Sequence, residues 1–76
     1  MEEFLNFVLR RLAGHPDEVF IAHAEVAGQD VFTARIPRAD MPRIIGKHGQ
    51  TIHAVRSLLA AGAQKHGRKV QLVVPD

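Results

Sequence analysis

Four consecutive residues, Gly46-Lys47-His48-Gly49, carry the most specific chemical signal in this chain. Glycine has no Cβ, so its backbone adopts positive φ angles and lets another molecule approach closely. The two residues between the glycines bring an ammonium group and an imidazole to the tip of a loop that contains no acid. Amide groups at the start of a following helix would add a favourable potential for an anion. These residue types at this spacing favour the binding of a phosphate group.

Catalysis is poorly supported by the same residues. A Walker phosphate loop needs four residues between its glycines and Lys-Ser/Thr directly after the second, whereas here Lys47 follows the first glycine and Gln50 the second. Ser57 is the only serine, and its position within a predicted helix is a poor one for a nucleophile. We therefore expect that the protein is not an enzyme.

Metal binding is poorly supported too. The five histidines form no HxxxH or HxxH pair on one helical face, and the chain has no cysteine. We therefore expect neither a metal ion nor another cofactor. The absence of cysteine also fits a reducing compartment such as the cytosol.

The loop lies between two predicted helices. Asp40-Met41-Pro42 is typical of a helix start, with Asp40 or Met41 as the capping residue, and Gly46 ends this short helix. A longer helix is predicted from about residue 50 to residue 66, before Gly67. Its apolar stripe follows helical spacing and comprises Ile52, Val55, Leu59, Gly62 and His66.

The rest of the chain predicts one further helix and three strands. Apolar residues at helical spacing predict a helix over residues 2–13, with Gly14 as its stop. Residues 18–26 and 31–36 read as a β-hairpin with a turn at residues 27–30, and residues 70–74 as a third strand. The order is α-β-β-α-α-β, which is an α+β class. We expect the phenylalanines in the core, without a stacking platform of the RRM type: Phe4, Phe7, Phe20 and Phe32.

Composition indicates a single small domain over residues 1–76. The apolar residue class makes up 46% of the chain, enough for one core, and no apolar run approaches the roughly 20 residues that span a bilayer. The N-terminus does not resemble a signal peptide. We expect a soluble, cytoplasmic protein.

Charge is distributed unevenly along the chain. Ten Lys and Arg against eight Asp and Glu give a net charge of only +2. From Arg38 onward, however, the only acids are Asp40 and Asp76, against seven basic residues. This segregation favours an anionic partner for the C-terminal half.

The element order, with GxxG between the fourth and fifth elements, resembles a type II KH domain. The chain is most similar to the small stand-alone bacterial KH-domain RNA-binding proteins of the KhpA type. The residues that carry this resemblance are spread over the chain: Pro16-Asp17, Asp40-Met41, Ile44 to Gly49, Thr51-Ile52, Val55-Arg56 and Lys69-Val70.

The resemblance implies a fold, a site and a role. The fold would be a three-stranded mixed sheet with three helices packed on one face. The site would hold about four nucleotides of single-stranded RNA at the GxxG loop, in a groove between the flanking helices and an adjacent strand. The family also implies an RNA-chaperone or post-transcriptional role, a complex with a second, larger KH-containing protein, and a link to cell elongation and envelope homeostasis.

Residues around the loop are expected to complete the RNA site. The predicted set is Gly46, Lys47, His48, Gly49, Arg43, Ile45, Gln50, Ile52 and Arg56. Of Ile44, Ile45 and Ile52, at least one should belong to the core and one to the groove wall. The sequence alone does not distinguish which is which. Arg43 and Arg56 either contact the RNA or are solvated helix charges, and Arg35 and Arg38 more readily fit solvated positions.

The oligomeric state and the ligand each have more than one interpretation. Leu58 and Ala61 of the long helix either form a homodimer contact or, for Leu58, widen the core stripe. A single module without aromatic stacking would bind RNA weakly, so doubling of the site would help. The alternative functions are a KH-shaped protein-interaction module with a degenerate groove and a single-stranded DNA binder.

Overall fold

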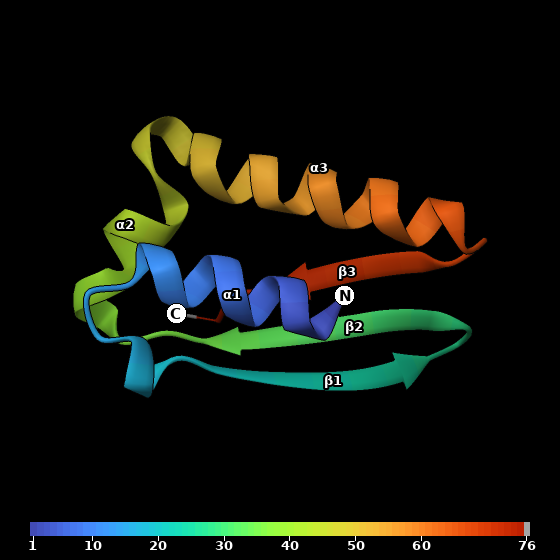
Figure 1. Cartoon of the computed structure of the whole chain (residues 1–76), viewed down its shortest axis with the longest axis horizontal. Helices are drawn as coiled ribbons and strands as arrows, with labels where there is room; N and C mark the ends of the chain where they lie inside the picture. Colours follow the sequence, from blue (N-terminus) through green and yellow to red (C-terminus); the bar gives the residue numbers. More distant parts are fainter. Residues whose placement is uncertain (76) are drawn as a thin grey trace.

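The computed structural model describes residues 1–75 and confirms the predicted element order (Figure 1). Asp76, which the charge analysis counts, lies outside the described residues. Three 3₁₀ turns separate the main elements: η1 (Pro16–Glu18), η2 (Arg38–Asp40) and η3 (Lys47–Gly49). The helices and strands are α1 (Glu2–Leu12), β1 (Phe20–Val26), β2 (Gln29–Arg35), α2 (Met41–Ile45), α3 (Gln50–Lys65) and β3 (Lys69–Val73).

The sheet is three-stranded and mixed, as predicted. Strand β2 is central, antiparallel to β1 and parallel to β3. Ala27 and Gly28 join β1 to β2 and both have positive φ, which suits the tight turn of a twisted hairpin. A parallel pair needs a long crossover connection, and here α2, η3 and α3 supply it between β2 and β3. The glycine loop is therefore part of the connection that makes the sheet parallel.

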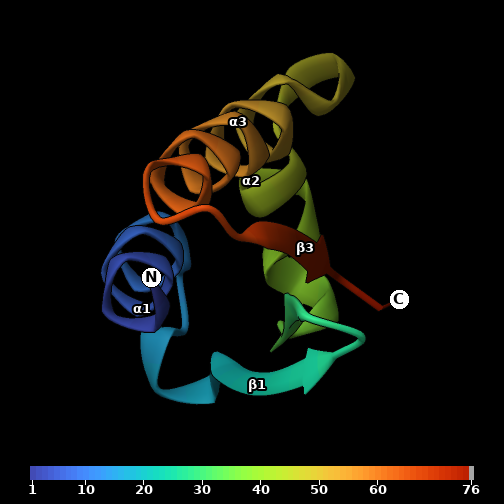
Figure 2. The ribbon, with the colours of Figure 1, turned by 90° about the vertical axis from the view of Figure 1, so that its right-hand side faces the viewer.

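The helices cover one face of the sheet and leave the other open. In Figure 2, α1 and α3 lie on the same side of the strands, and no helix of residues 1–75 covers the opposite side. α1 contacts β1, α3 contacts β3, and α2 contacts both helices. The type II KH arrangement is thus confirmed. In the described part of the chain, no helix has both the length and the apolar character that a membrane crossing requires.

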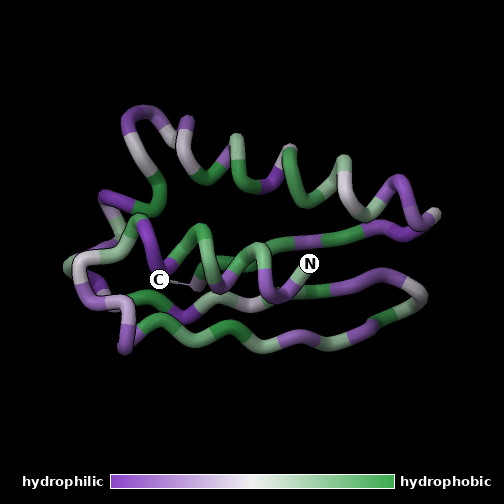
Figure 3. Tube along the Cα trace, in the orientation of Figure 1, coloured by the Kyte–Doolittle hydropathy of each residue, from purple (hydrophilic) through white to green (hydrophobic). Residues whose placement is uncertain are grey.

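The core lies between the helices and the covered face. Its largest fully buried side chain is Phe32 of β2, which is 1% exposed. The other buried apolar residues come from every main element except β1: Leu5, Leu9, Ala34, Ile44, Ile52, Val55, Leu59, Ala63 and Leu72, with Val19 from the segment before β1. The tube in Figure 3 shows that the loop joining α2 to α3 is hydrophilic to neutral in colour.

The prediction that all phenylalanines belong to the core is wrong for three of the four. Phe7 is 64% and Phe20 61% exposed, and Phe4 is partly exposed as well. The physical reason is the position of each residue. Phe7 lies off the Leu5–Leu9 stripe of α1, and Phe20 lies on the face of β1 that no helix covers.

Asp40 joins the start of α2 to the loop after α1. It occupies the N-cap position of α2, as predicted, but its side chain makes no capping hydrogen bond. Its carboxylate instead accepts hydrogen bonds from the His15 backbone N–H at 2.9 Å and from the His15 ring at 3.2 Å. Gly14 does not end α1 with a positive φ, because Ala13 is the C-cap. A Cβ on Gly14 would lie 3.1 Å from Asp40 Oδ1, so this glycine permits the close approach.

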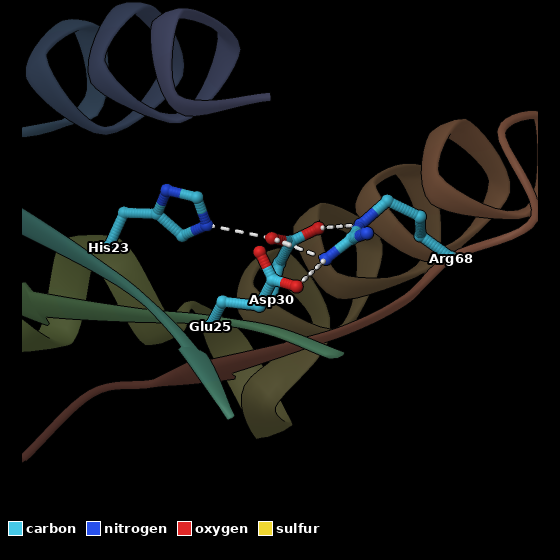
Figure 4. Close-up of polar contacts among 4 residues, drawn as sticks. All are labelled: His23, Glu25, Asp30 and Arg68. Atoms are coloured by element: carbon cyan, nitrogen blue, oxygen red, sulfur yellow. Dashed lines mark hydrogen bonds and ion pairs between the residues drawn. The ribbon is translucent and has the colours of Figure 1, made fainter. Parts of the chain in front are cut away.

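A second buried carboxylate, Asp30, joins β2 to the segment between α3 and β3 (Figure 4). Arg68 donates to it from Nε at 2.7 Å and from Nη2 at 3.2 Å. His23 Nε2 lies 2.8 Å from Asp30 Oδ1, and Glu25 forms a longer ion pair with Arg68 at 3.4 Å. The hydrogen bonds from Arg68 and His23 lower the pKa of Asp30, and Asp30 in turn raises the pKa of Arg68.

Both buried carboxylates should make the fold sensitive to acid. Burial by itself would raise the pKa of Asp40, but the hydrogen bonds from His15 outweigh it and the net pKa is lowered. A carboxylate with a lowered pKa binds its proton more readily in the unfolded chain. Its stabilisation is therefore present above the ordinary pKa of about 3.9 and is lost as the pH falls through the lower, folded-state value.

We expect Asp30→Asn to lower the free energy of unfolding most above about pH 4, and the difference from wild type to shrink in stronger acid. Urea unfolding followed by circular dichroism between pH 7 and pH 2.5 measures this. Asp17→Asn, at an exposed position in η1, is the control and should change little at any pH. A wild-type advantage over Asp30→Asn that is constant with pH would contradict the role given to the carboxylate charge.

Candidate nucleic-acid interface

The glycine loop has an unusual backbone that only its sequence permits. Gly46 has φ 78° and ψ 175°, a region almost restricted to glycine. His48 and Gly49 both adopt the left-handed conformation, with φ of 55° and 72°. For a non-glycine residue such as His48 this costs about 1–2 kcal/mol. The surrounding helices must compensate for this cost, so the loop shape is imposed by the fold.

Gly46 is required for packing as well as for its φ angle. Thr51, in the first turn of α3, fills the space where a side chain on Gly46 would be. A Cβ built there would meet Thr51 Oγ1, and it would lie 2.7 Å from Thr51 Cβ and 3.0 Å from Thr51 N. Gly49, in contrast, has no atom within 4 Å of such a Cβ. The loop is closed on its Gly46 side and open on its Gly49 side.

Backbone hydrogen bonds fix the loop and determine which amides are free. Gly46 N–H donates to Pro42 O at 2.9 Å, and Gly49 N–H donates to Gly46 O at 3.1 Å. Gln50 N–H donates to Lys47 O. The prediction that amides just after Gly49 face a phosphate is therefore corrected for Gln50, whose amide is already bonded. Among the turn and loop bonds of residues 1–75, none uses the amides of Lys47 and His48 at the tip.

The tip is exposed and lies in a strongly basic part of the chain. Lys47, His48 and Gln50 are all exposed, and no neighbouring side chain covers the loop at Gly49. Residues 41–75, which form α2, the loop, α3 and β3, contain six Lys and Arg and no Asp or Glu. Every wall of a groove built from these elements therefore lacks carboxylates. Such a surface attracts a polyanion.

The isoleucines beside the loop divide between core and surface. Ile44 is fully buried and Ile52 belongs to the core cluster, so the structure does not bring the predicted site residue Ile52 to the surface. Ile45 is 37% exposed. It lines an open pocket of about 550 Å³ between α2 and the end of β2, together with Ile36, Arg38 and Met41. Ile45 is therefore the isoleucine that can form an apolar wall.

Arg56 bridges α3 and β3. Its Nη2 donates to Leu72 O at 3.2 Å, across a shallow cleft of about 390 Å³. The cleft is lined by Arg56, Leu59, Ala60, Val70, Gln71 and Leu72. It lies along the flank of α3 that points away from α1. The structure thus brings the predicted residue Arg56 into a groove between a loop-flanking helix and an adjacent strand.

The other predicted arginine, Arg43, points elsewhere. A Cβ on Gly14 would lie 2.8 Å from Arg43 Nη1, so the guanidinium lies over the segment between α1 and η1. Arg38, which the sequence placed with the solvated residues, is exposed, and it also lines the open pocket beside Ile45. The sequence held no periodic signal for Arg38, because it lies in η2 between a strand and a helix.

Leu58 lies on the opposite flank of α3 from Arg56, because residues two apart on a helix point about 200° from each other. It is 61% exposed, so it does not widen the core stripe. Together with Met1, Phe4, Leu59 and Gly62 it lines an apolar hollow of about 260 Å³ between α1 and α3. We call this the α1–α3 patch. Helix α3 therefore has one core stripe and two exposed flanks, one with Arg56 at the cleft and one with Leu58 at the α1–α3 patch.

Comparisons with known proteins agree with this architecture. The family model described as KhpA/KhpB, KH domain matches residues 2–74. The protein named RNA-binding protein KhpA in Chlamydia muridarum is 32% identical over 76 residues, which is 100% of this chain and 97% of that protein. Proteins of the same name in Listeria monocytogenes and Borreliella burgdorferi are 31% and 34% identical, each over 97% of this chain and over 97% and 90% of their own lengths. No solved structure gives a significant match. These names describe RNA binding and no reaction, in agreement with the expectation of a non-enzymatic module.

The two glycines should differ in their tolerance of a methyl group. Gly46→Ala should lower the free energy of unfolding by about 2–4 kcal/mol, because it adds backbone strain to a clash with Thr51. Gly49→Ala should cost only about 1 kcal/mol, since its surroundings are open. Urea unfolding at neutral pH measures both. Equal losses, or a larger loss for Gly49→Ala, would show that the close packing at Gly46 is not a constraint.

Proposed function

Because this chain belongs to the KhpA/KhpB KH-domain family, we propose that it binds single-stranded RNA at the Gly46–Gly49 loop and along the cleft between α3 and β3. One observation carries the proposal: the loop tip offers an exposed lysine and two amides without an acceptor on a surface that lacks carboxylates. The names of the relatives support RNA as the polyanion.

The geometry suggests how a short strand would lie. Two phosphates would contact the loop, where the Lys47 ammonium and the tip amides act as donors. The bases would follow the exposed flank of α3 toward β3, past Ile45 and Arg56. Arg56 can exchange its bond to Leu72 O for a base edge or a phosphate. The family resemblance implies that about four nucleotides are held at the loop.

The wider role rests on the family resemblance. We propose a single type II KH domain that acts in the cytoplasm as an RNA chaperone or post-transcriptional regulator. The resemblance also supports a complex with a larger KH-containing protein and a link to cell elongation and envelope homeostasis. The weak binding expected of one short groove fits a module that works with a second one.

The double variant Lys47→Asp, His48→Asp tests the loop directly. Fluorescence anisotropy with a labelled single-stranded RNA should show a loss of affinity of about tenfold or more, because the change removes charged donors and adds repulsion. The matched control is Lys65→Asp, His66→Asp, which makes the same charge change in the same dipeptide at the far end of α3. The control should retain most of the binding.

Three outcomes distinguish the candidate functions. Equal binding by wild type and the loop variant would overturn the proposal, and no binding by a folded wild type would favour a protein-interaction module with a degenerate groove. A DNA oligomer of the same sequence, used as competitor, shows which nucleic acid is preferred. Far-UV circular dichroism of each variant establishes that the fold is retained.

We also propose a homodimer contact that is formed by Leu58 of the α1–α3 patch and by Ala61 beside the patch. Two features support this contact: Leu58 is exposed, and its neighbours Ala61 and Gly62 are small. Small residues beside a leucine allow two helices to approach closely. The patch also lies on the opposite flank of α3 from the cleft, so both sites can be used at once.

Leu58→Arg should give a folded monomer, because it places a charge in the contact without disturbing the core. Sedimentation velocity at several protein concentrations measures the change. His53→Arg, an exposed change on the other flank of the same helix, should leave the oligomeric state unaltered. An unfolded Leu58→Arg variant, or a wild type that is monomeric at every concentration, would count against the contact.

A further inference from the structure

The face of the sheet that no helix covers has a defined composition. Paired residues of neighbouring strands point to the same side, so the register fixes which side chains lie there. We call this the open face. It comprises Phe20, Ala22, Ala24, Val26, Gln29, Val31, Thr33, Arg35, Lys69, Gln71 and Val73. None of these residues is acidic, and two are cations.

One corner of the open face combines an aromatic ring with a cation. Phe20 of β1 pairs with Arg35 of β2, and both are exposed. Phe20 is the only aromatic residue on this face, and its neighbours Ala22 and Thr33 are small enough to let a planar group reach the ring. An exposed ring stacks a nucleobase, and a guanidinium beside it can contact the attached phosphate.

Along the chain, this corner adjoins residues that line the proposed RNA site. Arg35 directly precedes Ile36, which lines the pocket of Ile45, and Ile45 directly precedes the loop. Arg38 lines the same pocket and adds a third cation to Lys47 and Arg35 along the way. Two acids, Asp17 and Glu18, precede Phe20 in the chain and belong to η1.

We infer that a single strand longer than the loop can hold continues past Ile45 onto the open face, where Phe20 stacks one nucleobase and Arg35 binds its phosphate. This inference rests on the proposed RNA binding and extends it by one subsite. Charge favours a nucleic acid over a protein partner as the occupant, because the residues of the open face include two cations, Arg35 and Lys69, and no acid.

The test compares two RNA lengths and two phenylalanines. Phe20→Ala should reduce the affinity for a 12-nucleotide strand by at least about fivefold, because loss of one base–aromatic stack lowers affinity by at least this factor. The affinity for a 4-nucleotide strand should not change. Phe7→Ala is the matched control, because Phe7 is equally exposed but lies on α1. It should change neither affinity. Arg35→Gln should reduce the slope of log affinity against log salt by about 1 for the longer strand only.

The outcomes separate the subsite from the RNA site itself. A wild type that binds neither strand would overturn the proposed function and the subsite together. A wild type that binds both strands, with Phe20→Ala equal to Phe7→Ala, would overturn the subsite alone. Light scattering measures the oligomeric state of wild type and Phe20→Ala. If Phe20→Ala dissociates an oligomer and leaves the RNA affinity unchanged, the open face is a protein interface and the inference is wrong.

Discussion

The close contact between Gly46 and Thr51 is the constraint on which the rest of the site depends. Thr51 occupies the space of the missing side chain, so α3 can begin almost directly after α2 ends. This tight corner places Lys47 and His48 at an exposed tip and leaves their amides without a backbone acceptor in the described loops. Any side chain at position 46 would force the two helices apart, and the tip would lose its shape. The binding chemistry thus follows from a packing requirement.

The two buried carboxylates, Asp30 and Asp40, hold the elements that form the basic surface, although they do not lie on it. Asp30 and Asp40 are the only acids between residues 26 and 75, and each is buried and engaged by cationic or donor groups. Asp30 anchors the segment before β3, and Asp40 anchors the start of α2. They hold both ends of the crossover in place without presenting negative charge to the groove. Stability and electrostatic attraction are in this way supplied by different parts of the chain.

Helical and strand periodicity was sufficient to predict the element order and the place of the loop, whereas the mixed sheet was implied by the resemblance to type II KH domains. Patterns of this kind record which residues face a core, and Leu5, Phe32 and Leu59 followed them. They do not record what covers the second face of a strand or helix, which is why Phe20 and Leu58 needed the structure. The destinations of Arg38 and Arg43 also depended on tertiary packing, because long side chains in a short helix can turn to either side.

Amide NMR during titration with a short single-stranded RNA shows which amides of the loop bind phosphate. If phosphate binds the free donors of the corner, the amide protons of Lys47 and His48 should show the largest shifts, because they gain a charged acceptor. Those of Gly49 and Gln50 should move less, since they already donate within the loop. Large shifts confined to Gly49 and Gln50, or to residues remote from the corner, would contradict the account.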